Sequence, residues 1–389
     1  MTVYLDHAAT TPMLSAAREA WLEALGLVGN PSSIHSDGQN AKRMLEDARE
    51  RIAASLGCDP IEVVFTSGGT ESVNLAIKGL YWAAVAADSE RRRILVPRGE
   101  HHATVDTVEW LERHEGAIVQ WLPVDEYGRV SPAEVESALS SHADMALVTL
   151  LWANNEVGTI QPVADIVALA TKYGVPVHAD AVAAYRHLPI DFAASGLAAL
   201  SVSAHKIGGP LGMGALVLSR KATVVPLIHG GGQQRQVRSG TQDAPAAHAF
   251  AAAAEHPVSD LSALRDELIA GVAGAVPSAI LRGDPVNRLD NNAHFTFPGC
   301  EGDSLLFLLD AAGISVSTGS ACQAGIPEAS HVLIGMGLDE QEARGALRFT
   351  FGHTSIRSDI RALVAALPNA HEKAVRAGLA TRETSKGTR

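Results

Sequence analysis

A glycine-rich turn is the first place where the sequence suggests chemistry. In FTSGGTES, residues 65–72, an apolar run leads into Gly68 and Gly69, and a helical pattern follows them. Glycines let a backbone approach a ligand closely, and the first turn of a helix offers free N–H groups to a phosphate. The segment has neither the lysine of a nucleotide-binding P-loop nor the spacing of a dinucleotide fold. A helix that Thr70 caps, with no ligand, is the alternative interpretation.

Two charged residues farther along the chain fit an organic cofactor. Asp180 ends the apolar run VPVHAD, where a carboxylate is costly unless it faces a cation or a strong donor. Lys206 lies in SVSAHKIGG, among small residues and a histidine. An aspartate that keeps a ring nitrogen protonated, a lysine that forms a Schiff base and a phosphate-binding turn together predict a site for pyridoxal 5'-phosphate.

Three further segments carry side chains that such a site could use. His101 follows the apolar run RILVP and either stacks on a cofactor ring or lies on the surface. Asn154 and Asn155 follow the strongest apolar run, where they either cap the next segment or donate to the cofactor. The stretch 229–243, predicted to be free of helix, is rich in glycine and carries Arg235 and Arg238. Glycine-rich loops of this length in a compact domain are more often functional than idle.

Short apolar runs alternate with longer amphipathic stretches, which predicts βα units around a mostly parallel sheet. The predicted buried strands are 62–66, 93–97, 145–152, 175–180 and 214–219. Between the first two, Val73, Ile77 and Leu80 recur at helical spacing. An alanine-rich helix over 244–256 is predicted to bridge two domains. The division that we expect is a large cofactor-binding domain, 15–255, and a small domain formed by 1–14 and 256–389.

Composition excludes several classes of protein. The 389 residues carry a net charge of −12, so no basic excess is present to bind nucleic acid. No uncharged apolar run reaches the roughly 18 residues of a membrane span, and the N-terminus does not resemble a signal peptide. The three cysteines show no paired spacing that would indicate disulfides or a zinc site. We therefore expect a protein of the reducing cytoplasm, with no nucleic-acid or membrane partner and no metal.

One cysteine lies in an unusual setting. Cys322 occurs in STGSACQAG, where its neighbours are almost all small. By itself this stretch fits an ordinary small apolar residue as well as a reactive thiol. Only reactive residues elsewhere in the chain can distinguish between these two interpretations.

The motifs together resemble the NifS/IscS-like cysteine desulfurases, which are pyridoxal-phosphate enzymes of the class-V aminotransferase superfamily. The resemblance runs from Tyr4 to about Ser355 and rests on YLDHAATTP, GNPSSIH, FTSGGTESVNLAIKG, EHHATVD, NNEVGTIQP, SAHKIGGPLGMGAL, HGGGQQRQVRSGT, GCEGDSLL, STGSACQAG and LRFTFGHTS. It implies fold type I of these enzymes, an α/β fold in which a large domain with a mostly parallel seven-stranded sheet accompanies a smaller α+β domain.

The resemblance also implies a role for each matching residue. Lys206 would bind the cofactor covalently, Asp180 would pair with its ring nitrogen, and His101 would stack on the ring and shuttle protons. The remaining roles are phosphate binding by Gly69, Thr70, Ser203 and His205, contact with the phosphate of the other subunit of a homodimer by Thr241, contact with cofactor and substrate by Asn155, binding of the substrate carboxylate by Arg348, and nucleophilic attack by Cys322.

The implied reaction converts L-cysteine to L-alanine. Lys206 would remove the Cα proton, and the Cys322 thiolate would take the substrate sulfur as a persulfide for an acceptor protein in Fe–S cluster assembly or thio-modification. A selenocysteine lyase, another class-V aminotransferase or a weakly active sulfur-relay scaffold are the alternatives. Two positions depart from the family: Ala183 replaces a glutamine that donates to the cofactor, and His353 replaces an arginine found in many relatives.

Overall fold

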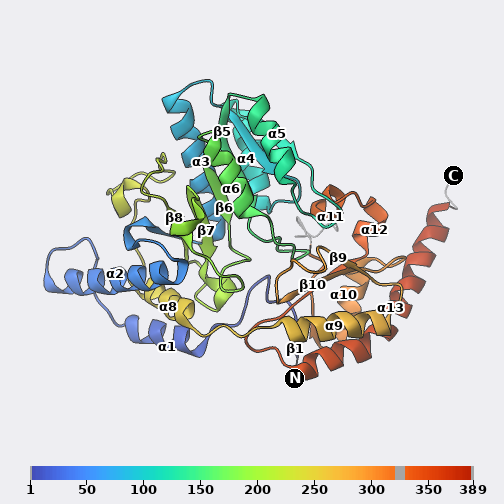
Figure 1. The fold of residues 1–389 in the computed structure, drawn as a ribbon. Coiled ribbons are helices and arrows are strands. Elements are labelled where there is room, and N and C mark those ends of the chain that lie inside the picture. Colours follow the sequence, from blue (N-terminus) through green and yellow to red (C-terminus); the bar gives the residue numbers. More distant parts are fainter. Residues whose placement is uncertain (1, 320–328, 387–389) are drawn as a thin grey trace.

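A seven-stranded sheet occupies the centre of the larger part of the molecule (Figure 1). The computed structural model describes residues 2–319 and 329–386. The strand order is β2-β8-β7-β6-β5-β3-β4, and β8 alone runs opposite to the other six strands. The strands are β2 (Val63–Thr66), β3 (Arg93–Pro97), β4 (Ile118–Leu122), β5 (Met145–Leu151), β6 (Val177–Asp180), β7 (Ala199–Ser203) and β8 (Gly214–Leu218). The sheet confirms the predicted α/β fold with a mostly parallel seven-stranded sheet.

Burial on both faces explains which strands the sequence reveals. All seven residues of β5 are buried, so this strand reads as an unbroken apolar run. Sequence patterning did not identify β4 or β7 as strands. Strand β4 lies at the sheet edge, is only partly buried and contains Gln120, while β7 places serines at positions 201 and 203. Polar residues in these two strands interrupt the apolar signal.

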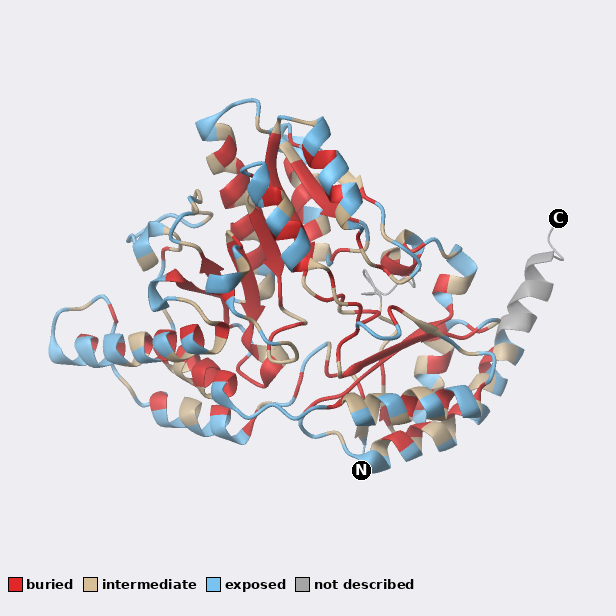
Figure 2. Cartoon of the chain, viewed as in Figure 1, coloured by how far each residue is buried: buried red, intermediate tan, exposed pale blue. Residues whose placement is uncertain are grey.

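Helices cover the two faces of this sheet (Figure 2). Residues of the same strand contribute to two separate cores, one on each face. Val148 and Leu150 of β5 face the core on one side, whereas Ala146 and Leu147 belong to the core on the other. The first core also contains residues of α1 (Ser15–Ala24), α2 (Ser36–Leu56), α5 (Pro132–Ser141), α6 (Val163–Lys172), α7 (Phe192–Ser195) and α8 (Ala244–Glu255); the second contains residues of α3 (Gly69–Ala87) and α4 (His102–Glu115).

A separate apolar core lies in the remainder of the chain. Leu5 from the N-terminal segment packs there with residues of the C-terminal third. The elements around it are β1 (Val3–Tyr4), α9 (Ser262–Ala275), β9 (Ile280–Arg282), β10 (Asn292–Thr296), α10 (Gly302–Ala311), β11 (Ile314–Ser315), β12 (Ala346–Thr350) and α13 (Arg357–Lys386), with α11 (His331–Gly335) and α12 (Glu340–Arg344) beside them. This core motivates the proposed small domain, 1–14 and 256–389, whose exact boundaries stay a prediction.

Three short 3-10 turns complete the connections: η1 (Pro60–Glu62), η2 (Ala204–Ile207) and η3 (Gln234–Gln236). The last of these is a three-residue turn with positive φ angles, so the stretch 229–243 contains one short turn and no α-helix. None of the helices in the described part of the chain combines the length and the apolarity that a membrane crossing needs.

Candidate active site

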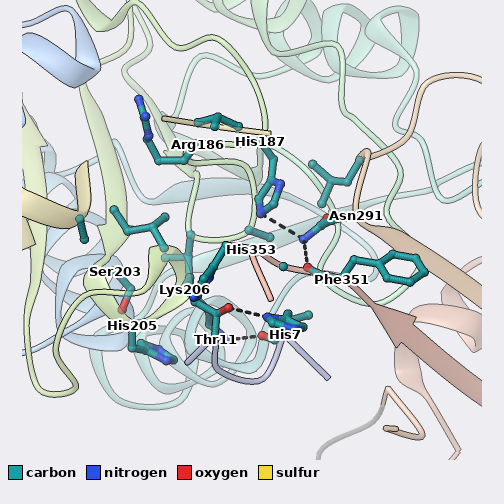
Figure 3. A pocket seen from close by; sticks show the side chains of 18 of the residues that line it. His7, Thr11, Arg186, His187, Ser203, His205, Lys206, Asn291, Phe351 and His353 are labelled. Atoms are coloured by element: carbon teal, nitrogen blue, oxygen red, sulfur yellow. Dashed lines mark hydrogen bonds between the residues drawn. The ribbon is translucent and has the colours of Figure 1, made fainter. Parts of the chain in front are cut away.

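A cavity of about 630 Å³ lies where the parallel strands end (Figure 3). Its walls come from both parts of the molecule, because Asp180 and Ser203 end β6 and β7 while Asn291, Phe351 and His353 come from the smaller part. The predicted site residues that line it are Gly69, Thr70, His101, Asn155, Asp180, Ser203, His205 and Lys206. The open edge of a parallel sheet is where such folds place their ligands.

One end of the cavity is suited to an anion. Helix α3 begins at Gly69, and its N-cap is Gly68, which has φ +150°. Thr70 is already the second residue of the helix, so the interpretation of Thr70 as the cap is wrong. Only glycine readily adopts the backbone conformation of the observed cap. A Cβ atom on Gly69 would lie 2.7 Å from Val182 Cγ2. The Ser203 hydroxyl is buried here without a hydrogen-bond partner among the described residues. Free N–H groups and an unpartnered hydroxyl fit a phosphate group.

Asp180 contributes a buried carboxylate to another part of the cavity lining. Its Oδ1 accepts a hydrogen bond of 2.9 Å from the Val182 backbone N–H. Burial raises the pKa of Asp180 to about 6, although the Val182 N–H and the charge of Lys206 act in the opposite direction. A protonated ring nitrogen would provide the missing counter-charge. The carboxylate therefore fits the pyridine ring of pyridoxal phosphate.

Lys206 lies in η2, immediately after the end of β7, and its ammonium group reaches the N-terminal segment. Its Nζ donates to the carbonyl oxygens of Ala8 and Ala9. Burial and then the charge of Arg348 lower the pKa of Lys206 to about 8, while Asp6 and Asp180 raise it. A lysine with this pKa is partly neutral near pH 7–8 and can act as a nucleophile or a base.

The lowered pKa of Lys206 predicts how the cofactor-free protein takes up pyridoxal phosphate. Only the neutral amine attacks an aldehyde, so uptake should quicken as the pH rises and level off above about pH 8. An ordinary lysine would show a midpoint near 10.5. Stopped-flow absorbance of cofactor binding between pH 6 and 10 measures this midpoint. A midpoint near 10.5 would contradict the burial of the amine.

Two histidines beside Lys206 are neutral at physiological pH. Burial and the charge of Lys206 lower the pKa of both His101 and His205 to about 4. The Nδ1 atom of His101 accepts a hydrogen bond from Ala103 N–H at the start of α4, which leaves the proton of the neutral ring on Nε2. His205 lies next to Thr10, with 3.2 Å between Nδ1 and Oγ1. A neutral His101 ring can stack on a cofactor and accept or donate a proton.

The two asparagines after β5 have separate positions. Asn154 is buried, and its Oδ1 accepts from the backbone N–H groups of Glu156 and Val157, so this residue caps the following turn. Asn155 lines the cavity instead. Capping therefore describes Asn154, whereas the contact of Asn155 with the cofactor stays a prediction.

Two of the predicted site residues do not line the cavity, and a third lies outside the described residues. Arg348 is 5% exposed, forms an ion pair of 2.9 Å with Asp6 and donates to the Asn155 carbonyl. Thr241 is exposed and lies in the loop after η3. Cys322 lies outside the described residues, but the segment before it is placed: Ser317 pairs with Arg348 through two backbone hydrogen bonds. The roles of these three residues stay predictions.

Sequence patterning missed the contribution of the N-terminal segment to this cavity. His7 and Thr11 line it and contact each other, with 2.5 Å between Nδ1 and Oγ1. Asn291 also lines it and donates to His187 and to the carbonyl of Phe351. The motif YLDHAATTP contributes to the family resemblance, but no local pattern in it indicates that it returns to a site about 200 residues away.

Comparison with known proteins agrees with this geometry. The family model of the class-V aminotransferases matches residues 3–363. An IscS-like cysteine desulfurase of Mycobacterium tuberculosis is 53% identical over 98% of this chain and 100% of its own length. The cysteine desulfurase NifS of Azotobacter vinelandii is 38% identical over 94% of this chain and 92% of its own.

Solved structures give the same result. A NifS-like protein superposes with a TM-score of 0.86 at 34% identity and covers 96% of this chain and 99% of its own. SspA in complex with cysteine superposes with a TM-score of 0.81 at 34% identity, with 91% and 100% covered. The chain belongs to the class-V aminotransferase family and, within it, to the cysteine desulfurases of the IscS and NifS type. Its cofactor is pyridoxal 5'-phosphate.

Proposed function

We propose that the protein converts L-cysteine to L-alanine and transfers the sulfur atom to Cys322 as a persulfide. The observation that carries this proposal is the combination of Lys206, with its lowered pKa, and buried Asp180 in one cavity with the start of α3. The names of the relatives identify cysteine as the substrate class. Fe–S cluster assembly or thio-modification is the proposed use of the sulfur.

The predicted site residues would then have defined tasks. When bound, pyridoxal phosphate supplies an aldehyde that condenses with amines and a ring that withdraws electrons from the substrate Cα. Gly69, Thr70, Ser203 and His205 would bind its phosphate, and Asp180 would hold the proton on its ring nitrogen. Lys206 would remove the proton from the substrate Cα, with His101 as a second proton carrier. Asn155 and Arg348 would bind the substrate side.

Cys322 would complete the sulfur transfer. Its thiolate attacks the substrate sulfur, a sulfur–sulfur bond forms, and the Cβ–sulfur bond breaks with its electron pair on carbon. Cβ takes a proton and becomes the methyl group of alanine. The sum of the reaction is one thiol and one cysteine converted to one persulfide and one alanine, so no external oxidant or reductant is needed.

The homodimer, the cellular compartment and the sulfur acceptor are also part of this proposal. Thr241 is exposed on the loop after η3, where it is available to the cofactor site of a second copy in a homodimer. The described cysteines, Cys58 and Cys300, are free thiols, which suits the reducing cytoplasm in which we propose that the enzyme acts. A sulfur acceptor protein would receive the persulfide sulfur.

Ala183 offers a direct test of the cofactor environment. It lines the cavity, three residues after Asp180. We expect Ala183→Gln to restore a hydrogen-bond donor beside the cofactor and to stabilise its deprotonated phenolic oxygen. The absorbance of the bound cofactor should then titrate at lower pH than in the wild type. An unchanged titration would place Ala183 away from the ring.

Alanine formation from L-cysteine by the purified protein tests the function as a whole. The account predicts a yellow protein that forms alanine and releases sulfide when a thiol reductant is added. A coloured protein that uses only selenocysteine would favour a selenocysteine lyase. A colourless protein that forms no alanine would favour a scaffold and would overturn the proposal.

A further inference from the structure

The glycine-rich loop 229–243 is attached to the edge of the central sheet by one glutamine side chain. The Gln234 amide oxygen accepts a 2.7 Å hydrogen bond from Phe65 N–H, and its nitrogen donates to the Phe65 carbonyl at 2.8 Å. Strand β2 is an edge strand, so the amide pairs with it as a neighbouring strand would. Phe65 lies three residues before Gly68, at the start of the turn proposed to bind the cofactor phosphate.

The backbone around Gln234 is held in an unfavourable conformation. Gln234, Arg235 and Gln236 have φ values of 49°, 60° and 64°, in the left-handed region that residues other than glycine rarely adopt. Such strain persists only where surrounding contacts impose it. Buried Arg49 adds a contact, because its guanidinium donates to Gln234 Oε1 at 3.3 Å and lies 4.7 Å from the centre of the Phe65 ring.

A second attachment reaches the other end of the same turn. Arg238 forms an ion pair with Glu71, 2.9 Å between Nε and Oε1, and Glu71 Oε2 accepts a 2.7 Å hydrogen bond from Ser67 N–H. Both charged side chains are largely buried. Burial raises the pKa of Glu71, but the hydrogen bonds from Arg238 and Ser67 outweigh it and leave the pKa below its usual value. Glu71 is thus an anion in the first turn of α3, next to Thr70.

We propose that Gln234 and Arg238 are positioning residues that fix both ends of the phosphate-binding turn, and that Arg238 also neutralises a carboxylate which would otherwise repel the cofactor phosphate. Retention of pyridoxal phosphate is then coupled to the structure of loop 229–243. This inference rests on the proposed phosphate site at Gly69, Thr70 and Ser203. Neither residue contacts the cavity, so each acts through Phe65 or Glu71.

Dissociation of bound pyridoxal phosphate from the purified holoenzyme tests the coupling. We expect Arg238→Ala and Gln234→Ala each to release the cofactor about ten-fold faster, the size expected when a hydrogen bond in a partly buried network is lost. Hydrogen exchange of the peptide that spans 63–72 should quicken in parallel, because the Phe65 N–H loses its acceptor in Gln234→Ala. Gln234→Glu, which can still accept from Phe65 N–H but cannot donate to its carbonyl, should lie between the wild type and Gln234→Ala.

A second substitution tests whether Arg238 acts through its charge. If Arg238 acts by neutralising Glu71, the double variant Arg238→Ala/Glu71→Gln should retain the cofactor better than Arg238→Ala alone. A purely structural role of the ion pair predicts that the second substitution brings no recovery. Gln236→Ala is the matched control, since it removes a glutamine from the same turn whose amide makes no hydrogen bond in the described structure.

The outcomes separate the coupling from the cofactor site itself. A wild type that binds pyridoxal phosphate and forms alanine, with variants that release the cofactor at the wild-type rate, overturns the coupling alone. If the double variant retains the cofactor no better than Arg238→Ala, the proposed role of the charge is overturned. A wild type that never takes up the cofactor overturns the proposed phosphate site. If Gln234→Ala does not fold, Gln234→Glu and Arg238→Ala decide the question by the same measurements.

Discussion

Lys206→Ala should lower the rate of alanine formation from L-cysteine by at least about a thousand-fold, because proton transfer by a positioned side chain alone contributes roughly 10²–10⁴-fold. The substitution removes the amine that burial and Arg348 hold at a pKa of about 8. It should also lower the affinity for pyridoxal phosphate, which loses its covalent attachment. Alanine production under single-turnover conditions measures the first effect, and equilibrium dialysis of the cofactor measures the second.

Lys78→Ala is a suitable control for this experiment. Burial also lowers the pKa of Lys78, but this lysine stacks on the Trp110 ring, 4.2 Å from its centre, outside the cavity lining. Its replacement should leave alanine formation within about two-fold of the wild type, as expected for a lysine that neither binds nor reacts with substrate. Equal losses in the two variants would mean that Lys206 acts through stability rather than chemistry.

Cys322→Ala should keep the colour of the bound cofactor and lose sulfide release by at least about a hundred-fold, since a nucleophile that forms a covalent intermediate is removed. The cavity residues that would bind the cofactor are unaltered in this variant. Difference absorbance before and after addition of L-cysteine should still report substrate binding. Sulfide release in the presence of a thiol reductant measures the loss.

The other cysteines provide matched controls for Cys322. Burial raises the pKa of Cys58 to about 12 and that of Cys300 to about 11, so both remain thiols at neutral pH. A thiol that stays protonated is a poor nucleophile. Cys58→Ala should therefore release sulfide at the wild-type rate. If sulfide release survived in Cys322→Ala and failed in Cys58→Ala, the nucleophile would be Cys58 and not Cys322.

The parts of the site that could be predicted from the sequence are those that strand ends bring together. Asp180 and Ser203 each end a parallel strand, and Lys206 follows three residues later. The C-terminal ends of parallel strands meet at one edge of the sheet, so the position of Asp180 at the end of a predicted strand was sufficient to place it at a ligand site. Strand β7 was not predicted; Lys206 was grouped with Asp180 by the chemistry of its residue type, and Ser203 by the family resemblance. The strand over 93–97 was predicted with its observed bounds for a similar reason, since four of its five residues are buried.

Contacts between distant segments were beyond such reasoning. The Lys206 ammonium binds carbonyls of Ala8 and Ala9, and Arg348 pairs with Asp6, although neither segment carries a local signal for the other. The attachment of Gln234 to Phe65 joins residues 169 positions apart through a side-chain amide that resembles any surface glutamine in the sequence. These interactions depend on the folded arrangement of both parts of the chain, and their partners become visible only there.

The most direct test of the persulfide mechanism is the mass of the peptide that contains Cys322 after one turnover with L-cysteine and no added reductant. The account predicts a gain of one sulfur atom on this peptide, in amounts equal to the alanine formed, and loss of the gain on treatment with a thiol reductant. Alanine formed with an unmodified Cys322 peptide, or with the sulfur atom on Cys58 or Cys300, would contradict it.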